Sequence, residues 1–309
     1  MKWRKRGVIW KPRGDQPWAR SHAMLPTPLL IDPETIRIYV NCLDDQGRSR
    51  PTFVDVSSYD PRVIKHNAED PLLDIGPPGD FDDNGLAVTS VVDAGAGRMY
   101  LYYAGFELLR TVRYRILTGL AVSHDGGLTF SRHKLNPILE RSSAEMLFRC
   151  GPYVMRRNGV FKLWYIAGST FETVWDKSVP VYDLRYQESA DGVHWDDEGQ
   201  ISLQLTDADE HGFGRPWVVQ CERSDRYRMF YSIRRRSLSA YRLGYAESHD
   251  GISWIRKDDE MGLDVGDHGP DNRAICYSTY IEAHGKAYCF YNGNDFGVDG
   301  ILLAELIDD

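Results

Sequence analysis

The residues of this sequence that could do chemistry are acidic side chains placed just before short apolar runs. Asp82 and Asp83 precede "LAVTSVV", Glu210 precedes "GFGRPWVV", and Asp271 precedes "ICYSTY". Two carboxylates on opposite sides of one pocket are the minimum for acid–base cleavage of a glycosidic bond. These four residues are our catalytic candidates, provided that the fold brings them to one place.

A repeat of about 62 residues would position them. Pro28, Ser90, Pro152, Pro216 and Ser278 correspond to one another, at spacings of 62, 62, 64 and 62. Each unit contains alternating aromatic and β-branched runs, such as "GRMYLYYAG" and "GVFKLWYIAG", which are typical of strands. About four strands per unit and no convincing helix predict an all-β fold. We expect a single five-bladed β-propeller domain over residues 1–309.

The fifth unit is one strand short. After "YCFYNGNDFG" only "GILLAEL" (300–306) remains, whereas "RGVIW" (6–10) near the N-terminus has no partner in its own unit. An open ring would leave strand edges unpaired. We therefore expect residues 6–10 to pair beside 300–306 and to close the ring.

A Ser-x-Asp-Gly turn occurs three times, as "SHDGGLTF", "SADGVHW" and "SHDGISW", with Asp125, Asp191 and Asp250. Asp and Gly tolerate tight turn geometry, so each phrase predicts a hairpin between the outer strands of a blade, with the following aromatic packed between blades. Ligand or metal binding by the three aspartates is the alternative. Repetition in successive units favours the architectural interpretation.

The inner strands of a propeller line a central funnel, so the segments before the corresponding positions would share one cavity. Besides the carboxylates and His211, these segments carry candidates for substrate binding: His22, Arg149, Arg215, Arg273, Trp217 and Tyr277. Guanidinium groups suit a carboxylate or phosphate, which predicts an anionic ligand. The alternative is that the arginines only neutralise the neighbouring acids.

Composition excludes several classes of function. The net charge of −8 argues against a nucleic-acid binder, and no apolar run is long enough to span a bilayer. The basic N-terminus lacks the apolar stretch of a signal peptide, and the five cysteines form no CxxC pair. We expect reduced thiols and a cytoplasmic location. The histidines have no metal-ligand spacing and no Gly-rich phosphate loop is present, so we expect no metal and no cofactor.

The repeat, the turns and the acidic segments resemble the five-bladed propellers of glycoside hydrolase families 43, 32 and 130. Almost the whole chain is similar to uncharacterised glycosidase-like propellers found among bacterial polysaccharide genes. The matching stretches are "SHAMLPTPLL", "GDFDDNGL", "LYYAG", "DEHGFGRPWVV", "GYAESHDGISW" and "YNGNDFG".

The resemblance implies a protein that cleaves or transfers a glycosyl unit. Glu210 would be the general acid, with Arg215 orienting the substrate, and Asp83 the base or nucleophile, with Asp82 as its substitute. Asp271 would tune the pair or hold sugar hydroxyls.

Two departures from the pattern leave other functions open. His22 stands where families 43 and 32 place an acid, which favours a non-catalytic carbohydrate-binding propeller. Arg273 stands where relatives have an acidic residue, which favours an anionic ligand. Similarity to family 130 adds a phosphate-using glycoside phosphorylase as a further alternative. The expected partner is a small molecule or an oligosaccharide.

Overall fold

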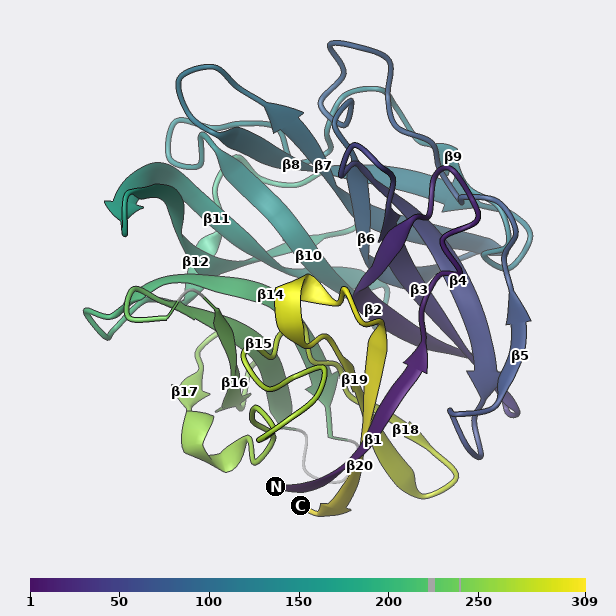
Figure 1. Ribbon diagram of the computed structural model, residues 1–309. Coiled ribbons are helices and arrows are strands. Elements are labelled where there is room, and N and C mark those ends of the chain that lie inside the picture. Colours follow the sequence, from purple (N-terminus) through teal and green to yellow (C-terminus); the bar gives the residue numbers. More distant parts are fainter. Residues whose placement is uncertain (222–225, 239) are drawn as a thin grey trace.

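The computed structural model describes residues 1–221, 226–238 and 240–309. Within these residues, regular structure consists of twenty strands and two short 3-10 helices, η1 (Asp258–Glu260) and η2 (Asn294–Phe296). The expectation of an all-β protein is therefore confirmed (Figure 1). The five cysteines are all free, as expected.

The strands of the described chain form five antiparallel units of four. The first unit contains β2 (Ser21–Asp32), β3 (Thr35–Leu43), β4 (Ser49–Ser57) and β5 (Ile64–Asn67). The second contains β6 (Leu86–Gly95), β7 (Arg98–Leu108), β8 (Tyr114–Ser123) and β9 (Ser131–Arg132). The third contains β10 (Phe148–Arg157), β11 (Val160–Val174), β12 (Lys177–Ser189) and β13 (Gln200–Leu203). The fourth contains β14 (Glu210–Gln220), β15 (Tyr227–Arg235), β16 (Tyr241–Ser248) and β17 (Ile255–Arg256). The fifth contains β18 (Ile281–Ala283), β19 (Lys286–Tyr291), β20 (Ile301–Asp308) and β1 (Lys2–Trp10).

The fourth strand of the fifth unit comes from the other end of the chain. β1 runs antiparallel to β20, with Val8 opposite Leu302 and Trp10 opposite Ile301. The two termini consequently lie close together (Figure 1). The predicted pairing of residues 6–10 with 300–306 is confirmed, and it extends back to Lys2.

Short parallel contacts join the second, third and fourth units. β8 pairs with the start of β10, and β12 meets β14 at Tyr182 and Gly212. These contacts lie where the inner strands begin, at the segments that carry the predicted site residues.

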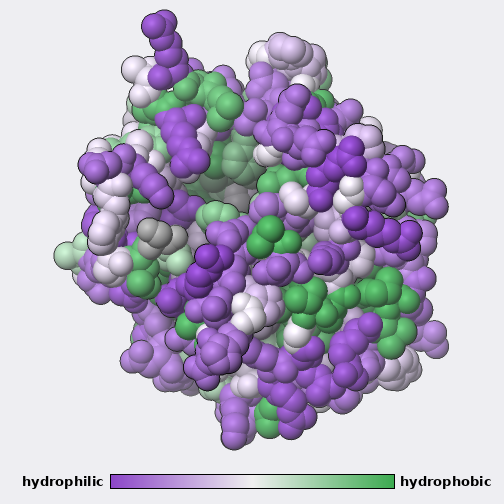
Figure 2. All heavy atoms as spheres, in the orientation of Figure 1, coloured by the Kyte–Doolittle hydropathy of each residue, from purple (hydrophilic) through white to green (hydrophobic). Residues whose placement is uncertain are grey.

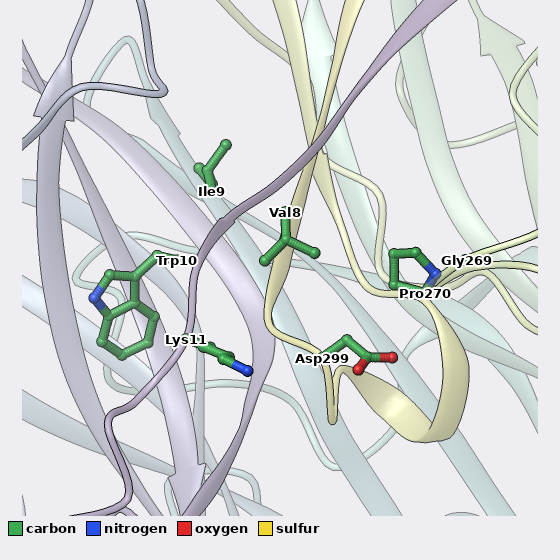
Figure 3. Close-up of a pocket in the computed structure, with 7 residues that line it drawn as sticks. All are labelled: Val8, Ile9, Trp10, Lys11, Gly269, Pro270 and Asp299. Atoms are coloured by element: carbon green, nitrogen blue, oxygen red, sulfur yellow. The ribbon is translucent and has the colours of Figure 1, made fainter.

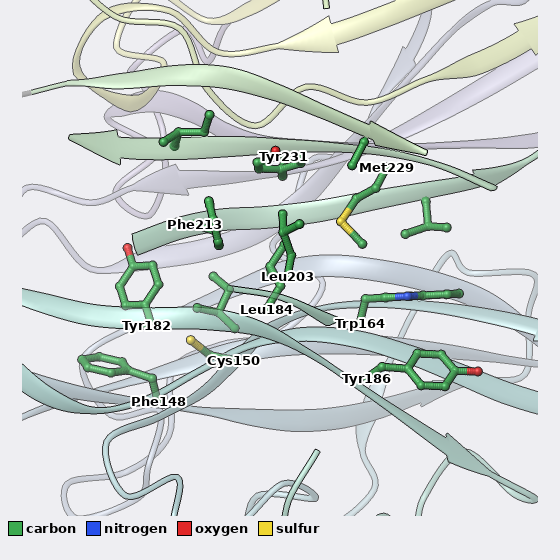
Figure 4. Packing of buried hydrophobic residues seen from close by; sticks show 14 of the residues in the cluster. Phe148, Cys150, Trp164, Tyr182, Leu184, Tyr186, Leu203, Phe213, Met229 and Tyr231 are labelled. Atoms are coloured by element: carbon green, nitrogen blue, oxygen red, sulfur yellow. The ribbon is translucent and has the colours of Figure 1, made fainter. Parts of the chain in front are cut away.

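The core lies between units. Each of the five hydrophobic clusters of the described chain takes side chains from at least two units, and one of them joins the fifth unit to the first. In the cluster between the third and fourth units, Trp164 and Leu184 face Phe213 and Met229 (Figure 4). Burial of this apolar surface is the main force that holds neighbouring units together.

The repeated Ser-x-Asp-Gly turn joins neighbouring units, and we call this its fastener role. In each copy the aspartate accepts main-chain N–H bonds within the turn; Asp250, for example, accepts from Ile252 and Ser253, both at 2.8 Å. Each turn glycine carbonyl also accepts a hydrogen bond from an aromatic side chain of the preceding unit. The three pairs are Tyr39 with Gly127, Tyr102 with Gly192 and Trp164 with Gly251. The following aromatics, Phe130, Trp195 and Trp254, pack against the inter-unit clusters, as predicted.

Candidate functional site

The first two candidate carboxylates, Asp82 and Asp83, lie at the entrance to the second unit. Asp82 is buried, and its Oδ2 accepts hydrogen bonds from Arg132 at 3.0 and 2.8 Å. Asp83 is partly exposed and accepts a main-chain hydrogen bond from Gly79 at 2.9 Å. Of these neighbours, Asp83 has the more accessible carboxylate.

The other two candidates are engaged in the same way as Asp82. Glu210 is buried, and its two oxygens accept hydrogen bonds from Arg256 at 2.6 and 2.8 Å. Asp271 is buried as well, pairs with Lys5 at 2.7 Å and accepts a hydrogen bond from Tyr291. Both carboxylates are therefore held by internal cations rather than presented to a ligand.

The pairing of a buried acid with a cation repeats from unit to unit. The third unit supplies its own case, since Glu145 is buried and pairs with Arg149 at 2.6 Å and with Arg185 at 3.1 Å. Each pair lies within one unit, and no hydrogen bond or ion pair of the described residues joins carboxylates of different units. Repetition in four units favours a role in holding each unit together.

Three other predicted site residues also have internal partners. Arg149, buried against Glu145, donates to the carbonyls of Glu140 and Asp196. Trp217 is buried between units and donates to the carbonyl of Tyr280 at 2.8 Å. Arg273 is largely exposed and pairs with an exposed acid, Asp295, at 2.8 Å.

His22 and η2 form one wall of the centre. His22 is partly buried on β2, with a left-handed φ of 61°. Burial lowers its pKa, and a hydrogen bond to the Asp295 carbonyl opposes that shift. Asp295 and Phe296 are also left-handed, and Phe296 stacks on Tyr277 with ring centroids 6.4 Å apart. Left-handed backbone at aromatic and acidic residues is costly and tends to collect at functional sites.

Arg234, which the sequence did not single out, lies at the centre of these elements. Its side chain interacts electrostatically with Tyr114, Tyr182, Tyr241 and Tyr277, which come from the second, third, fourth and fifth units. Its guanidinium carbon lies 4.6 Å from the centre of the Tyr241 ring. A side chain close enough to residues of four units to interact electrostatically with them lies near the middle of the assembly. We call these five residues the tyrosine–arginine cluster.

Local sequence explains how the tyrosines are seated. Arg234 and Tyr241 are cross-strand partners on β15 and β16. A Cβ on Gly212 would lie 2.6 Å from the Tyr182 ring, and one on Gly214 would lie 3.1 Å from the Tyr241 ring. The two glycines of "HGFGRPW" therefore leave the space that both rings occupy. The two hydroxyls lie 3.2 Å apart.

Arg215 lies beneath this cluster and has few partners. It is 1% exposed, donates to the carbonyl of Pro26 in the first unit at 2.8 Å, and lies over the Trp217 ring at 4.9 Å. Its Nε and Nη2 have no hydrogen-bond partner in the described part of the chain. Burial lowers the pKa of this guanidinium to about 9. Of the predicted binding residues, Arg215, Tyr277 and His22 lie at the centre.

The centre opens on one face of the molecule. Figure 2 shows this face hollowed between the second unit, the β11–β12 hairpin and η2, with apolar side chains visible inside. These elements border the tyrosine–arginine cluster, and we call the depression the central hollow. A second, shallow groove beside β1 is lined by Val8–Lys11, Gly269, Pro270 and Asp299 and contains none of the predicted site residues (Figure 3).

Two further features bear on the site. Within residues 1–221, 226–238 and 240–309, no three His, Cys, Asp or Glu side chains gather as metal ligands. No helix in that part of the protein is long and apolar enough to cross a membrane.

The sequence missed Arg234, Tyr114, Tyr182, Tyr241, Asp295 and Phe296. Arg234 belongs to the run "RRRS", which is indistinguishable from a solvated surface in the sequence. The paired glycines of "HGFGRPW" were the available signal, because glycine in a strand marks close approach by another group.

Comparison with solved structures shows what kind of fold carries this site. A structure described as a glycoside hydrolase matches with a TM-score of 0.76 at 17% identity, covering 97% of this chain and 90% of that one. A thermostable family-43 glycoside hydrolase matches with a TM-score of 0.69 at 14% identity, covering 94% and 91%. An endo-arabinase from Bacteroides thetaiotaomicron matches with a TM-score of 0.64 at 13% identity, covering 95% and 97%. The protein has a glycoside-hydrolase-like all-β fold.

Sequence comparison identifies two relatives of the chain. No family model matches it. The chain is 32% identical over 306 residues to two proteins of Mycobacterium tuberculosis, Uncharacterized protein Rv1502 and Uncharacterized protein MT1551. Each alignment covers 99% of this chain and 99% of the relative. The chain belongs to the family of these two proteins.

Proposed function

We propose that the protein is a single-domain, closed five-bladed β-propeller whose central hollow binds a saccharide. The blades are the five four-stranded units, and β1 closes the ring. Core clusters between successive units, including the one between the fifth and the first, support this arrangement. The meeting of tyrosines from four units around Arg234 supports a common centre.

The tyrosine–arginine cluster is the observation that carries saccharide binding. Tyrosine rings cover the apolar faces of sugars, and their hydroxyls bind sugar hydroxyls. Tyr277 and Tyr114 are partly exposed, so their rings are accessible from the hollow. The likeness to glycoside hydrolases, among them an endo-arabinase, supports a carbohydrate ligand.

Cleavage or transfer of a glycosyl unit is the second candidate function. It is favoured by the glycoside-hydrolase-like fold and by the partly exposed Asp83, which remains our candidate base or nucleophile. Glu210 as general acid would require Arg256 to release it, since both of its oxygens accept hydrogen bonds from that arginine. Phosphorolysis would differ from hydrolysis by requiring phosphate and by releasing a sugar phosphate.

A panel of oligosaccharides tests both functions. Binding is measured by calorimetry with wild type, Tyr277→Ala and, as a matched control, Tyr59→Ala, whose ring is exposed on the first unit. We expect Tyr277→Ala to weaken binding at least about tenfold, because aromatic stacking on a sugar is lost, and Tyr59→Ala to leave it unchanged. Failure of wild type to bind any saccharide, or equal binding by Tyr277→Ala, would refute the proposal.

Chromatography of the same mixtures separates binding from turnover. An intact ligand after long incubation assigns a binding protein. Released sugar that disappears with Asp83→Asn assigns an enzyme.

A further inference from the structure

Arg234 and Arg215 differ from the other predicted or central arginines near the inner strands because neither charge has a counter-ion among the described residues. Arg132, Arg149 and Arg256 each lie within 2.8 Å of a carboxylate. For Arg234, the described residues supply neither an ion pair nor a hydrogen bond; its neighbours are aromatic rings. Arg234 is half-buried, and a charge that is partly removed from water without a partner is costly. The surroundings of Arg234 are therefore suited to binding an anion.

The groups around Arg234 complement an anion. Burial raises the pKa of Tyr182 and Tyr277 well above the usual value, so both phenols are neutral and can donate hydrogen bonds. The pKa of Tyr114 is raised in the same direction for the same reason. A guanidinium surrounded by neutral donors, with no carboxylate competing for it, attracts negative charge.

Arg215 adds a second uncompensated charge from below. Its Nε and Nη2 lack partners in the described chain, and Tyr277 interacts electrostatically with both arginines. Two positive charges without counter-ions therefore lie at the centre of a protein whose overall charge is −8. In a concave site with low-dielectric walls, such a field is focused on the ligand.

We propose that Arg234 binds the carboxylate of an acidic sugar, so that the ligand of the central hollow is a uronate-containing saccharide. This inference rests on the proposed function. The planar guanidinium donates two parallel hydrogen bonds to a carboxylate, and the tyrosine hydroxyls hold the neighbouring sugar oxygens. Of the two guanidiniums without counter-ions only Arg234 is accessible, and one guanidinium matches the single charge and the two oxygens of a carboxylate.

Matched acidic and neutral ligands test the assignment. The probes are trigalacturonate, its methyl ester and a sugar phosphate, with binding measured by calorimetry at low and high salt. The proteins are wild type, Arg234→Met, Arg234→Lys and, as a control, Arg157→Met, which changes an exposed arginine on β10. Melting temperatures establish that each variant is folded.

We expect wild type to prefer the acid over the ester at least about tenfold, with a preference that falls as salt rises. Arg234→Met should abolish this preference and still bind the ester, and Arg157→Met should behave as wild type. Arg234→Lys, which keeps the charge, should keep part of the preference, and it decides the question if the Met variant does not fold.

Three outcomes would overturn the inference. An unchanged acid-to-ester ratio in a folded Arg234→Met variant removes Arg234 as the binding group and leaves the proposed function intact. An Arg234-dependent preference for the sugar phosphate replaces the carboxylate by a phosphate. Absence of binding by any saccharide refutes the proposed function together with the inference.

Discussion

Glu210→Gln separates a structural role for this residue from the catalytic role that the resemblance implies. The buried carboxylate accepts two hydrogen bonds from Arg256, at 2.8 and 2.6 Å, and its side chain is 1% exposed. Glutamine keeps the shape but removes the charge, and its NH₂ group would face a guanidinium that only donates. One of the two hydrogen bonds is therefore lost and the other is weakened.

The size of the effect follows from the contacts of Arg256. Removing one partner of a buried ion pair costs about 3–5 kcal/mol. Arg256 also contacts Asp258 at 2.6 Å and is 18% exposed, so part of its charge remains compensated. We expect a loss of about 2–3 kcal/mol in the free energy of unfolding, or about 3–5 °C in Tm for a chain of this length.

Urea denaturation and thermal melting measure this loss, with Glu69→Gln, an exposed acid, as the control. A cycle with Arg256→Met should show that the two changes are not additive, because each removes the same interaction. Unchanged stability of Glu210→Gln, together with loss of turnover on a confirmed substrate, would refute the structural assignment and restore Glu210 as the general acid.

Three further predictions concern the turns, the N-terminal strand and pH. Asp250→Ala should cost about 1–2 kcal/mol in unfolding free energy, because the Ile252 and Ser253 amides lose their acceptor; unchanged urea midpoints would contradict the fastener role. Deletion of residues 1–10 should lower Tm steeply and cause aggregation visible by light scattering, because β20 becomes an exposed edge; a monomeric, equally stable product would exclude a structural role for β1. Burial lowers the pKa of His211, so the unfolded state binds the proton more readily. Its contribution to stability is complete above about pH 6.5 and is lost as the pH falls toward the folded-state pKa, so urea midpoints should drop between pH 7.5 and pH 5, and less in His211→Gln. An identical drop in that variant would assign the effect to other groups.

The sequence by itself determined the elements and their repetition. Alternating aromatic and β-branched runs specify strands because side chains in a strand point to opposite faces in turn. The Asp-Gly turns are local as well, since the aspartate bonds only to amides a few residues away. Even the pairing of β1 with β20 was predictable, because a missing strand in one unit and a spare strand near the N-terminus have one economical solution.

Only the tertiary structure decided which charged side chains have an internal partner and which have none. Glu210 and Arg256 are 46 residues apart, and Arg215 reaches a carbonyl 189 residues away, so no local pattern reveals either contact. An acid before an inner strand has the same spacing whether it faces the hollow or holds an arginine of its own unit. The same ambiguity hid Arg234, which resembles its two ion-paired neighbours, Arg235 and Arg236, in sequence and stands among tyrosines of four units in space. The partner of each charged side chain depends on distances between chain segments that only folding brings together. These distances place Asp82, Glu210 and Asp271 in internal ion pairs. They also place Arg234 at the centre of the candidate site.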